Sequence, residues 1–200
     1  MSSVKITGNA SGSGVLTFSA PNTNSDRTID IPDKAGSLAL GAGAIVQVVQ
    51  ATKTDTAEVT GTSFADVTGM SVAITPASTS NKILVLLNVH YSTGADGAAS
   101  ILLLRGSTEI FKGDASSSRE RVTIGGVDLT NTNNALLTMD SASACYLDSP
   151  STTSSTTYKI QLRGRTSYGS GYINRTPTDN DDSTSGKRAV SSITVMEVQG

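Results

Sequence analysis

Residues of the kinds that usually carry catalysis are few in this chain and do not occur together. The sequence has one histidine, His90, and one cysteine, Cys145, too few nitrogen and sulfur ligands for a zinc site. His90 lies in an apolar run that reads as a strand, where a packed and hydrogen-bonded histidine is the common case. Cys145 is expected to be a small buried hydrophobe, as free cysteines usually are. We therefore expect no enzyme activity, no catalytic residue, no metal and no cofactor.

An acidic stretch, Thr178–Asp182, has a passing likeness to a calcium-binding loop. It lacks the central glycine and the final bidentate glutamate of such loops. The stretch is therefore predicted to be a solvated loop tip.

The most binding-like segment spans residues 163–175 and mixes arginine, tyrosine and glycine. Tyrosine and arginine anchor many interfaces, and glycine-rich loops carrying them adapt to a partner. The candidate receptor-contact residues are Arg165, Tyr168, Tyr172 and Arg175. The alternative is an ordinary loop between two strands.

Charge and composition exclude two classes of partner. The net charge is −2 and lysines and arginines are scattered, so the chain lacks the basic stripe of a nucleic-acid binder. Its longest apolar runs, 83–87 and 101–104, are far shorter than the roughly 20 residues that span a bilayer. No membrane insertion is expected, and with no apolar leader at Met1 the protein is expected to be made in a host cytoplasm.

The elements that must position these residues are predicted to be strands. Serine and threonine exceed a quarter of the chain, 19 glycines supply turns, and no window shows a helical period. This pattern predicts an all-β fold, an antiparallel β-sandwich of the jelly-roll or C1q/TNF-like type. Thr68-Gly69 is predicted to form a tight hairpin turn. The expected strands are 45–50, 64–67, 70–74, 82–91, 98–105, 109–112, 121–124, 135–139, 145–147, 157–163 and 189–198.

The chain is expected to have two parts. Residues 1–44 contain only short apolar patches between turn residues, too little apolar surface to fold alone. They are predicted to be an extended attachment segment, and residues 45–200 a β-sandwich domain. The candidate attachment residues are Phe18, Ile29, Ile31 and Leu38.

Two strands are apolar on both faces, which predicts an oligomer. In 82–91 and 98–105 apolar residues occupy consecutive positions, but a sandwich buries only one face of each sheet. The second faces, with Leu84, Leu86, Leu102 and Leu104, are the candidate oligomer interface. The alternative is a third layer formed by the N-terminal segment or by a long loop.

A resemblance adds to this interpretation. The stretch 12–40, with Ala20-Pro21-Asn22, Arg27-Thr28 and Pro32-Asp33 followed by Gly36 and Leu38, resembles a module of tail-fibre and other virion proteins of tailed phages. The remainder resembles, more loosely and mainly at its last strand 192–198, the compact sandwich domains that close phage fibres and decorate particles as trimers.

The resemblance implies a non-enzymatic structural protein of the virion. It would be a homotrimeric short tail-fibre or adhesin component that contacts a host glycan or receptor, and residues 1–44 would bind another virion protein. One alternative is a capsid decoration or cement protein on the head. A distant alternative is a carbohydrate-binding or carbohydrate-active protein.

Overall fold

The structure, a computed structural model, describes residue 24 and residues 42–94, 97–127, 137–165 and 169–200. The chain divides into two units, Met1–Leu38 and Ala39–Gly200, and the second is described here. Phe18, Ile29, Ile31 and Leu38 therefore lie outside the described residues, and the attachment segment stays a prediction.

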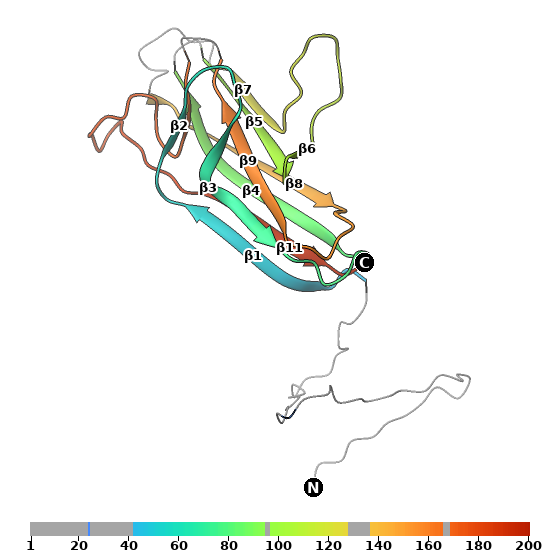
Figure 1. Ribbon diagram of the computed structural model, residues 1–200. Coiled ribbons are helices and arrows are strands. Elements are labelled where there is room, and N and C mark those ends of the chain that lie inside the picture. The colour runs from blue at the N-terminus through green and yellow to red at the C-terminus, as the bar shows by residue number, and fades with distance from the viewer. Residues whose placement is uncertain (1–23, 25–41, 95–96, 128–136, 166–168) are drawn as a thin grey trace. The chain divides into compact units, whose positions relative to one another are not determined.

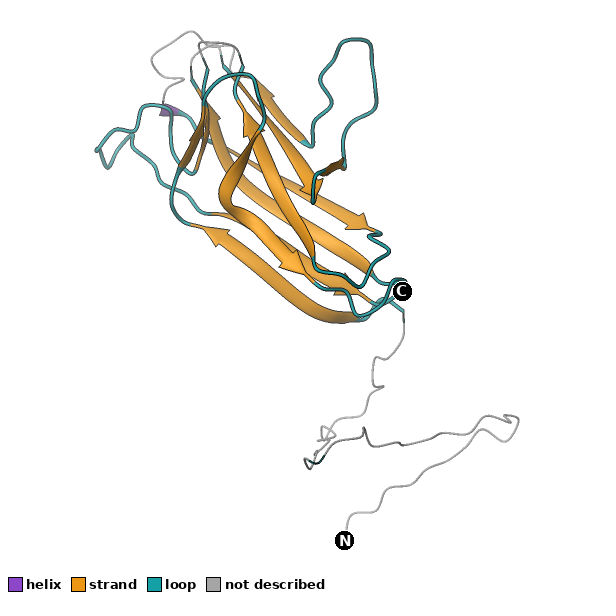
Figure 2. Ribbon diagram, in the orientation of Figure 1, coloured by secondary structure: helices purple, strands orange, loops and turns teal. Residues whose placement is uncertain are grey.

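The described residues form two antiparallel sheets packed face to face (Figures 1 and 2). One sheet has the order β1-β11-β4-β10-β2, with β8 also paired to β4; the other has the order β3-β9-β5-β6, with β7 also paired to β5. The strands are β1 (Ile45–Lys53), β2 (Ala57–Val59), β3 (Ala65–Ile74), β4 (Lys82–Thr93), β5 (Ala98–Arg105), β6 (Thr108–Ile110), β7 (Ile124–Val127), β8 (Asp140–Asp148), β9 (Thr156–Arg163), β10 (Gly171–Ile173) and β11 (Ser191–Val198).

The order of the principal strands is that of a jelly roll. If β6 and β7, which both pair with β5, count as one broken strand, the sheets are β1-β11-β4-β8 and β3-β9-β5-β6/β7. When these eight principal strands are numbered 1 to 8 along the chain, the first sheet has the order 1-8-3-6 and the second 2-7-4-5. Strands that are far apart in the chain therefore lie side by side. The all-β sandwich prediction is confirmed. The short strands β2 and β10 extend the first sheet and were not expected from the sequence.

Alternation along the strands builds the core between the sheets. In β4 the residues Ile83, Val85, Leu87, Val89 and Tyr91 are all buried, and in β9 the same holds for Tyr158, Ile160 and Leu162. Every second side chain of a strand points to the same face, so the remaining positions of β4 and β9 point away from the core.

Thr68 and Gly69 do not form the predicted hairpin turn. They lie inside the single strand β3, where the pairing with β9 shifts register between Asp66 and Ser71. Gly69 has a φ of +85°, the left-handed conformation that glycine adopts without strain. The dipeptide therefore produces a bulge, which bends the strand without reversing it.

A buried polar cluster links the two sheets at one edge of the core. The hydroxyl of Tyr158 in β9 donates to Asp148 Oδ2 in β8 at 2.6 Å, and Arg105 Nη1 in β5 donates to both Asp148 oxygens at 2.9 Å. Burial and the neighbouring carboxylate raise the pKa of Tyr158, so its hydroxyl keeps the proton that it donates. The cluster therefore fixes how the sheets meet at this edge.

A second buried carboxylate, Glu197 of β11, forms no ion pair with any residue that the structure describes. It accepts hydrogen bonds from Asn81 Nδ2 at 2.5 Å, from the Ala77 amide at 2.7 Å and from the Gln47 side chain. Burial alone raises the pKa of this carboxyl, but the hydrogen bonds outweigh it and hold the pKa below its usual value of 4.5. The charged form therefore joins β1, β11 and the β3–β4 connection.

The Glu197 carboxylate should make stability depend on pH in a defined direction. Because its pKa is lower in the folded than in the unfolded chain, it stabilises the fold above its unfolded pKa and ceases to do so as pH falls through the folded pKa. Glu197→Gln should lower the free energy of unfolding by about 1–3 kcal/mol at neutral pH. The difference from the wild type should shrink below about pH 4.5, as measured by urea unfolding at several pH values. A difference that is constant from pH 7 to pH 3 would contradict this assignment.

Candidate subunit interface

Four apolar residues form a row across the outer face of the first sheet. Val48 of β1 pairs with Met196 of β11, Met196 with Leu84 of β4, and Leu84 with Leu147 of β8. Val48 is 56% exposed and Leu147 45% exposed, and the two between them are half-buried. Antiparallel registers thus align side chains that are far apart in sequence.

The rows on either side show that this face changes from apolar to polar along the strands. Toward the start of β1, the next pair on this face is Ile45 and Val198, and Ile45 is 49% exposed. Toward the end of β1, the row after Val48 consists of Gln50, Thr194, Leu86 and Cys145. The row after that consists of Thr52, Ser192, Asn88 and Ser143. The apolar half lies at the end where β1 begins and β11 finishes, as Figure 1 shows.

We call the residues of the apolar half the β1–β8 patch. Its members are Ile45, Val48, Leu84, Leu86, Cys145, Leu147, Met196 and Val198. Of the six large hydrophobic residues that are exposed in the described chain, three belong to this patch and a fourth, Val46, is adjacent to it in β1. Lys82, paired with Val198, is the only charged side chain that these four described strands place on this face. A contiguous apolar patch of this kind is typical of an interaction surface.

The predicted interface residues divide between the two sheets, and half of the prediction is wrong. Leu84 and Leu86 lie on the patch and are partly accessible, so their role in an interface stays a prediction. Leu102 and Leu104 are 1% and 4% exposed in the single chain, so they do not present a free surface.

The connection between β6 and β7 reaches the outer side of β5 at Ser100. Its Glu120 accepts from Ser100 Oγ at 2.6 Å and pairs with Arg163 of β9 at 2.5 Å. Its Thr123 amide donates to the Ile101 carbonyl. A long loop was the alternative cover for a second apolar face, and these contacts place one over Ser100 of β5.

Cys145 differs from expectation in the same region. The sequence predicted a buried thiol, but Cys145 is exposed because it occupies the outward parity of β8, opposite Leu86. A small apolar residue between Ala144 and Tyr146 does not reveal which way it points; the β8 register with β4 does.

Two of the predicted receptor-contact residues are tied into the fold. The Arg175 guanidinium lies 4.1 Å from the Tyr172 ring centroid and pairs with Glu58 of β2 at 2.9 Å. The Arg175 side chain is only 12% exposed. These contacts join β10 to its neighbour β2, so they serve the sheet edge. Arg165 is exposed, and Tyr168 lies outside the described residues.

His90 and the acidic stretch also have internal partners. His90 Nδ1 lies 3.0 Å from the Val190 carbonyl oxygen. The Thr184 hydroxyl and amide and the Ser185 hydroxyl donate to Asp182 and lower its pKa to about 2. Asp179 pairs with Arg188 and, at 3.8 Å, with Arg175, which lowers the pKa of Asp179, mainly through the Arg188 hydrogen bond.

The described residues hold no group of three or more histidine, cysteine, aspartate or glutamate side chains placed to bind a metal ion. Among the same residues, no helix has the length and apolar character needed to cross a membrane.

Comparison with known proteins gives only distant likenesses. No family model and no curated protein matches the sequence. Among solved structures, one titled as infectious bursal disease virus, Gx strain, aligns at 12% identity and a TM-score of 0.36, covering 86% of this chain and 46% of that one. The Eiger TNF of S. frugiperda aligns at 8% identity and a TM-score of 0.32, covering 75% of this chain and 92% of that one. This chain thus spans about half the length of the first structure, and neither likeness carries an argument about function.

A charge in the β1–β8 patch should prevent self-association. Leu86→Asp places a carboxylate in the patch, and burying it unpaired costs about 3 kcal/mol or more, which is roughly a hundredfold in dissociation constant. Ser143→Asp is the matched control, since Ser143 lies one row beyond Cys145 on the same strand and face. Sedimentation velocity should show dissociation for the first variant only. Equal assembly of both variants would contradict the interface assignment.

The native cysteine allows the same interface to be tested by chemical labelling. Cys145 is the only cysteine and lies in the patch, so assembly should slow its reaction with a maleimide, and Leu86→Asp should restore the rate. A thiol that reacts equally fast in both proteins would remove the patch from the interface.

Proposed function

We propose that this chain is a non-enzymatic structural protein of a phage particle that works as a homotrimer, as a short tail-fibre or adhesin component that contacts the host. The observation that carries the proposal is the β1–β8 patch, an apolar surface on a sheet whose other face already forms the core. A second copy of the chain is the occupant that we propose, because the patch is almost uncharged. The trimer follows from the resemblance to trimeric sandwich domains.

The arrangement of the chain ends supports an attached particle component. The chain enters β1 beside the end of β11, where the Gly43 amide donates to the Gln199 carbonyl and the Gln199 amide to the Ala44 carbonyl. The apolar rows lie at this end, whereas β4 and β9 finish at the opposite end (Figure 1). Residues 1–44 would bind another virion protein, and the loops at the opposite end of the domain would face the host.

The N-terminal resemblance supports a virion location, and a capsid decoration protein on the head is the second candidate. The same patch would serve a trimer projecting from a shell, with residues 1–44 bound to the lattice. The two candidates differ in where the protein lies and in copy number, not in how the subunits meet.

Gold-labelled antibody microscopy on intact particles tests the proposal. Label at the tail, in a few copies, is the expected result for a fibre or adhesin component. Label spread over the head would replace it with the decoration protein. Particles that carry no label, while antibody binds the purified chain, would overturn the virion assignment.

A further inference from the structure

A hollow lies on the outer face of the second sheet, at the end of the sandwich opposite the start of β1 and the end of β11. It has a volume of about 320 Å³, at the lower end of the roughly 300–1,000 Å³ typical of small-molecule sites. Ala98 and Ser100 of β5 form its floor, and Gly125 and Gly126 of β7 form one wall. Ala98, Ser100 and Gly125 leave room for a ligand over β5 where larger side chains would fill it, whereas a side chain at Gly126 would point at Tyr91.

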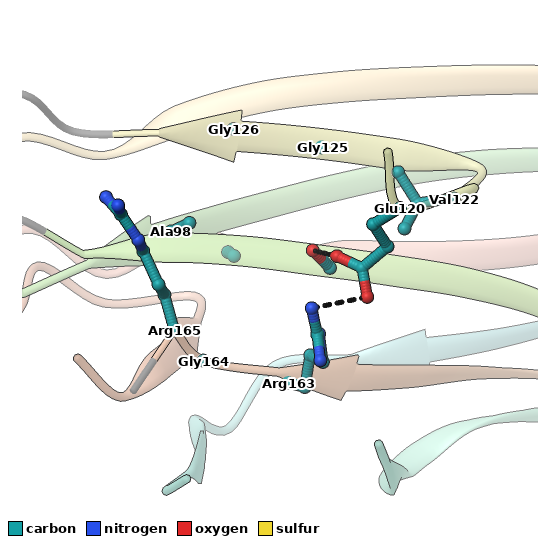
Figure 3. A pocket seen from close by; sticks show the side chains of 10 residues that line it. Ala98, Glu120, Val122, Gly125, Gly126, Arg163, Gly164 and Arg165 are labelled. Atoms are coloured by element: carbon teal, nitrogen blue, oxygen red, sulfur yellow. Dashed lines mark hydrogen bonds and ion pairs between the residues drawn. The ribbon is translucent and has the colours of Figure 1, made fainter. Parts of the chain in front are cut away.

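Two arginines border the hollow: Arg163, the last residue of β9, and Arg165, two residues further along the chain. In Figure 3 Arg163 rises from β9 to meet Glu120, and Arg165 rises beside Ala98 toward Gly126. The open space therefore lies between an ion pair on one side and a single guanidinium on the other.

The two arginines differ in how they are bonded. Arg163 pairs with Glu120 at 2.5 Å and donates to the Thr62 carbonyl at 2.9 Å, and its guanidinium lies 5.2 Å from the Phe64 ring centroid. The Arg165 side chain makes no hydrogen bond or ion pair with any other residue that the structure describes, and it is exposed. With two guanidinium groups and one carboxylate, the lining has an excess of one positive charge.

The polar atoms suit a ligand that has an anionic end and a hydroxylated end. A free guanidinium presents a planar fork of donors that matches a carboxylate. Glu120 Oε2 accepts a hydrogen bond from Ser100 and Oε1 forms the ion pair with Arg163, and each oxygen keeps a lone pair for a ligand hydroxyl. The Ser100 oxygen can likewise accept while its proton is donated to Glu120.

We propose that this hollow binds a sugar residue that carries a carboxylate, with the carboxylate on Arg165 and ring hydroxyls on Glu120 and Ser100. The inference rests on the host-contact part of the proposed function and names the ligand class for it. It also gives the ion pair of Arg163 and Glu120 a role: the pair holds the Glu120 carboxylate in place as an acceptor, so that Arg165 alone meets the anion.

The test uses the full chain with D-glucuronate, D-glucose and acetate as probes, measured by ligand-observed saturation-transfer NMR with competition. Glucuronate should bind more tightly than glucose or acetate, because only glucuronate has both a carboxylate and ring hydroxyls. Arg165→Gln should weaken glucuronate binding about tenfold or more, as expected for a charged hydrogen-bonded pair. Arg188→Gln, an exposed arginine on the Asp179 loop, is the matched control and should leave glucuronate binding unchanged.

A second variant separates sugar recognition from simple anion binding. Glu120→Gln removes the carboxylate that holds Arg163, so acetate should bind more tightly while the preference for glucuronate over acetate falls. Acetate binding as tight as that of glucuronate in the wild type would show an anion site only and overturn the proposal. Glucuronate binding that is unaffected by Arg165→Gln would also overturn it.

The oligomeric state, recorded on the same samples, keeps this inference distinct from the proposed function. A chain that assembles but does not bind glucuronate refutes the sugar site alone. A chain that binds glucuronate as a monomer refutes the proposed trimer and leaves the site standing.

Discussion

The structure depends on a constraint set by one strand: β4 is apolar on both faces, but a two-layer sandwich can bury only one of them. The side with Ile83, Val85 and Leu87 packs into the core. The side with Leu84 and Leu86 faces outward, and the pairing of β4 with β11 and β8 places Met196 and Leu147 beside Leu84. Antiparallel pairing thus turns the second face of one strand into a surface that extends over four strands.

The second sheet meets the same constraint within the chain. β5 is also apolar on both faces, yet its outward residues Leu102 and Leu104 are already buried in the single chain. Glu120 of the connection from β6 to β7 reaches Ser100 and Arg163, which fixes the connection to the sheet. The hollow lies where Glu120 of this connection, Ala98 and Arg165 border the sheet. In the part of the chain that the structure describes, the second sheet therefore buries its outward leucines, whereas the first sheet leaves an apolar face partly accessible.

Strand alternation made much of the fold predictable. The bounds of β5 and the inward residues of β4 and β9 follow from apolar periodicity, and turn residues between short strands indicate a sandwich. Alternation does not say what covers a face, so Leu84 and Leu102 looked alike in sequence although only Leu84 is accessible. Gly69 looked like a hairpin turn because glycine suits a bulge and a turn equally well.

Contacts between distant strands could not be predicted from local sequence. Glu197 looked like an ordinary polar residue in the last strand, but its partners Gln47, Ala77 and Asn81 are supplied by β1 and the β3–β4 connection. Arg175 looked like a free recognition residue, and only the pairing of β10 with β2 brings Glu58 to it. The site residues of this protein therefore depend on register, which one sequence does not specify.

The mass of the unmodified full chain in solution tests the central claim, that the outer face of the first sheet holds copies together. Native mass spectrometry or sedimentation equilibrium at micromolar concentration should give three times the chain mass of 20.5 kDa. A mass of 20.5 kDa that persists as the concentration rises would show that the patch is not a self-association surface.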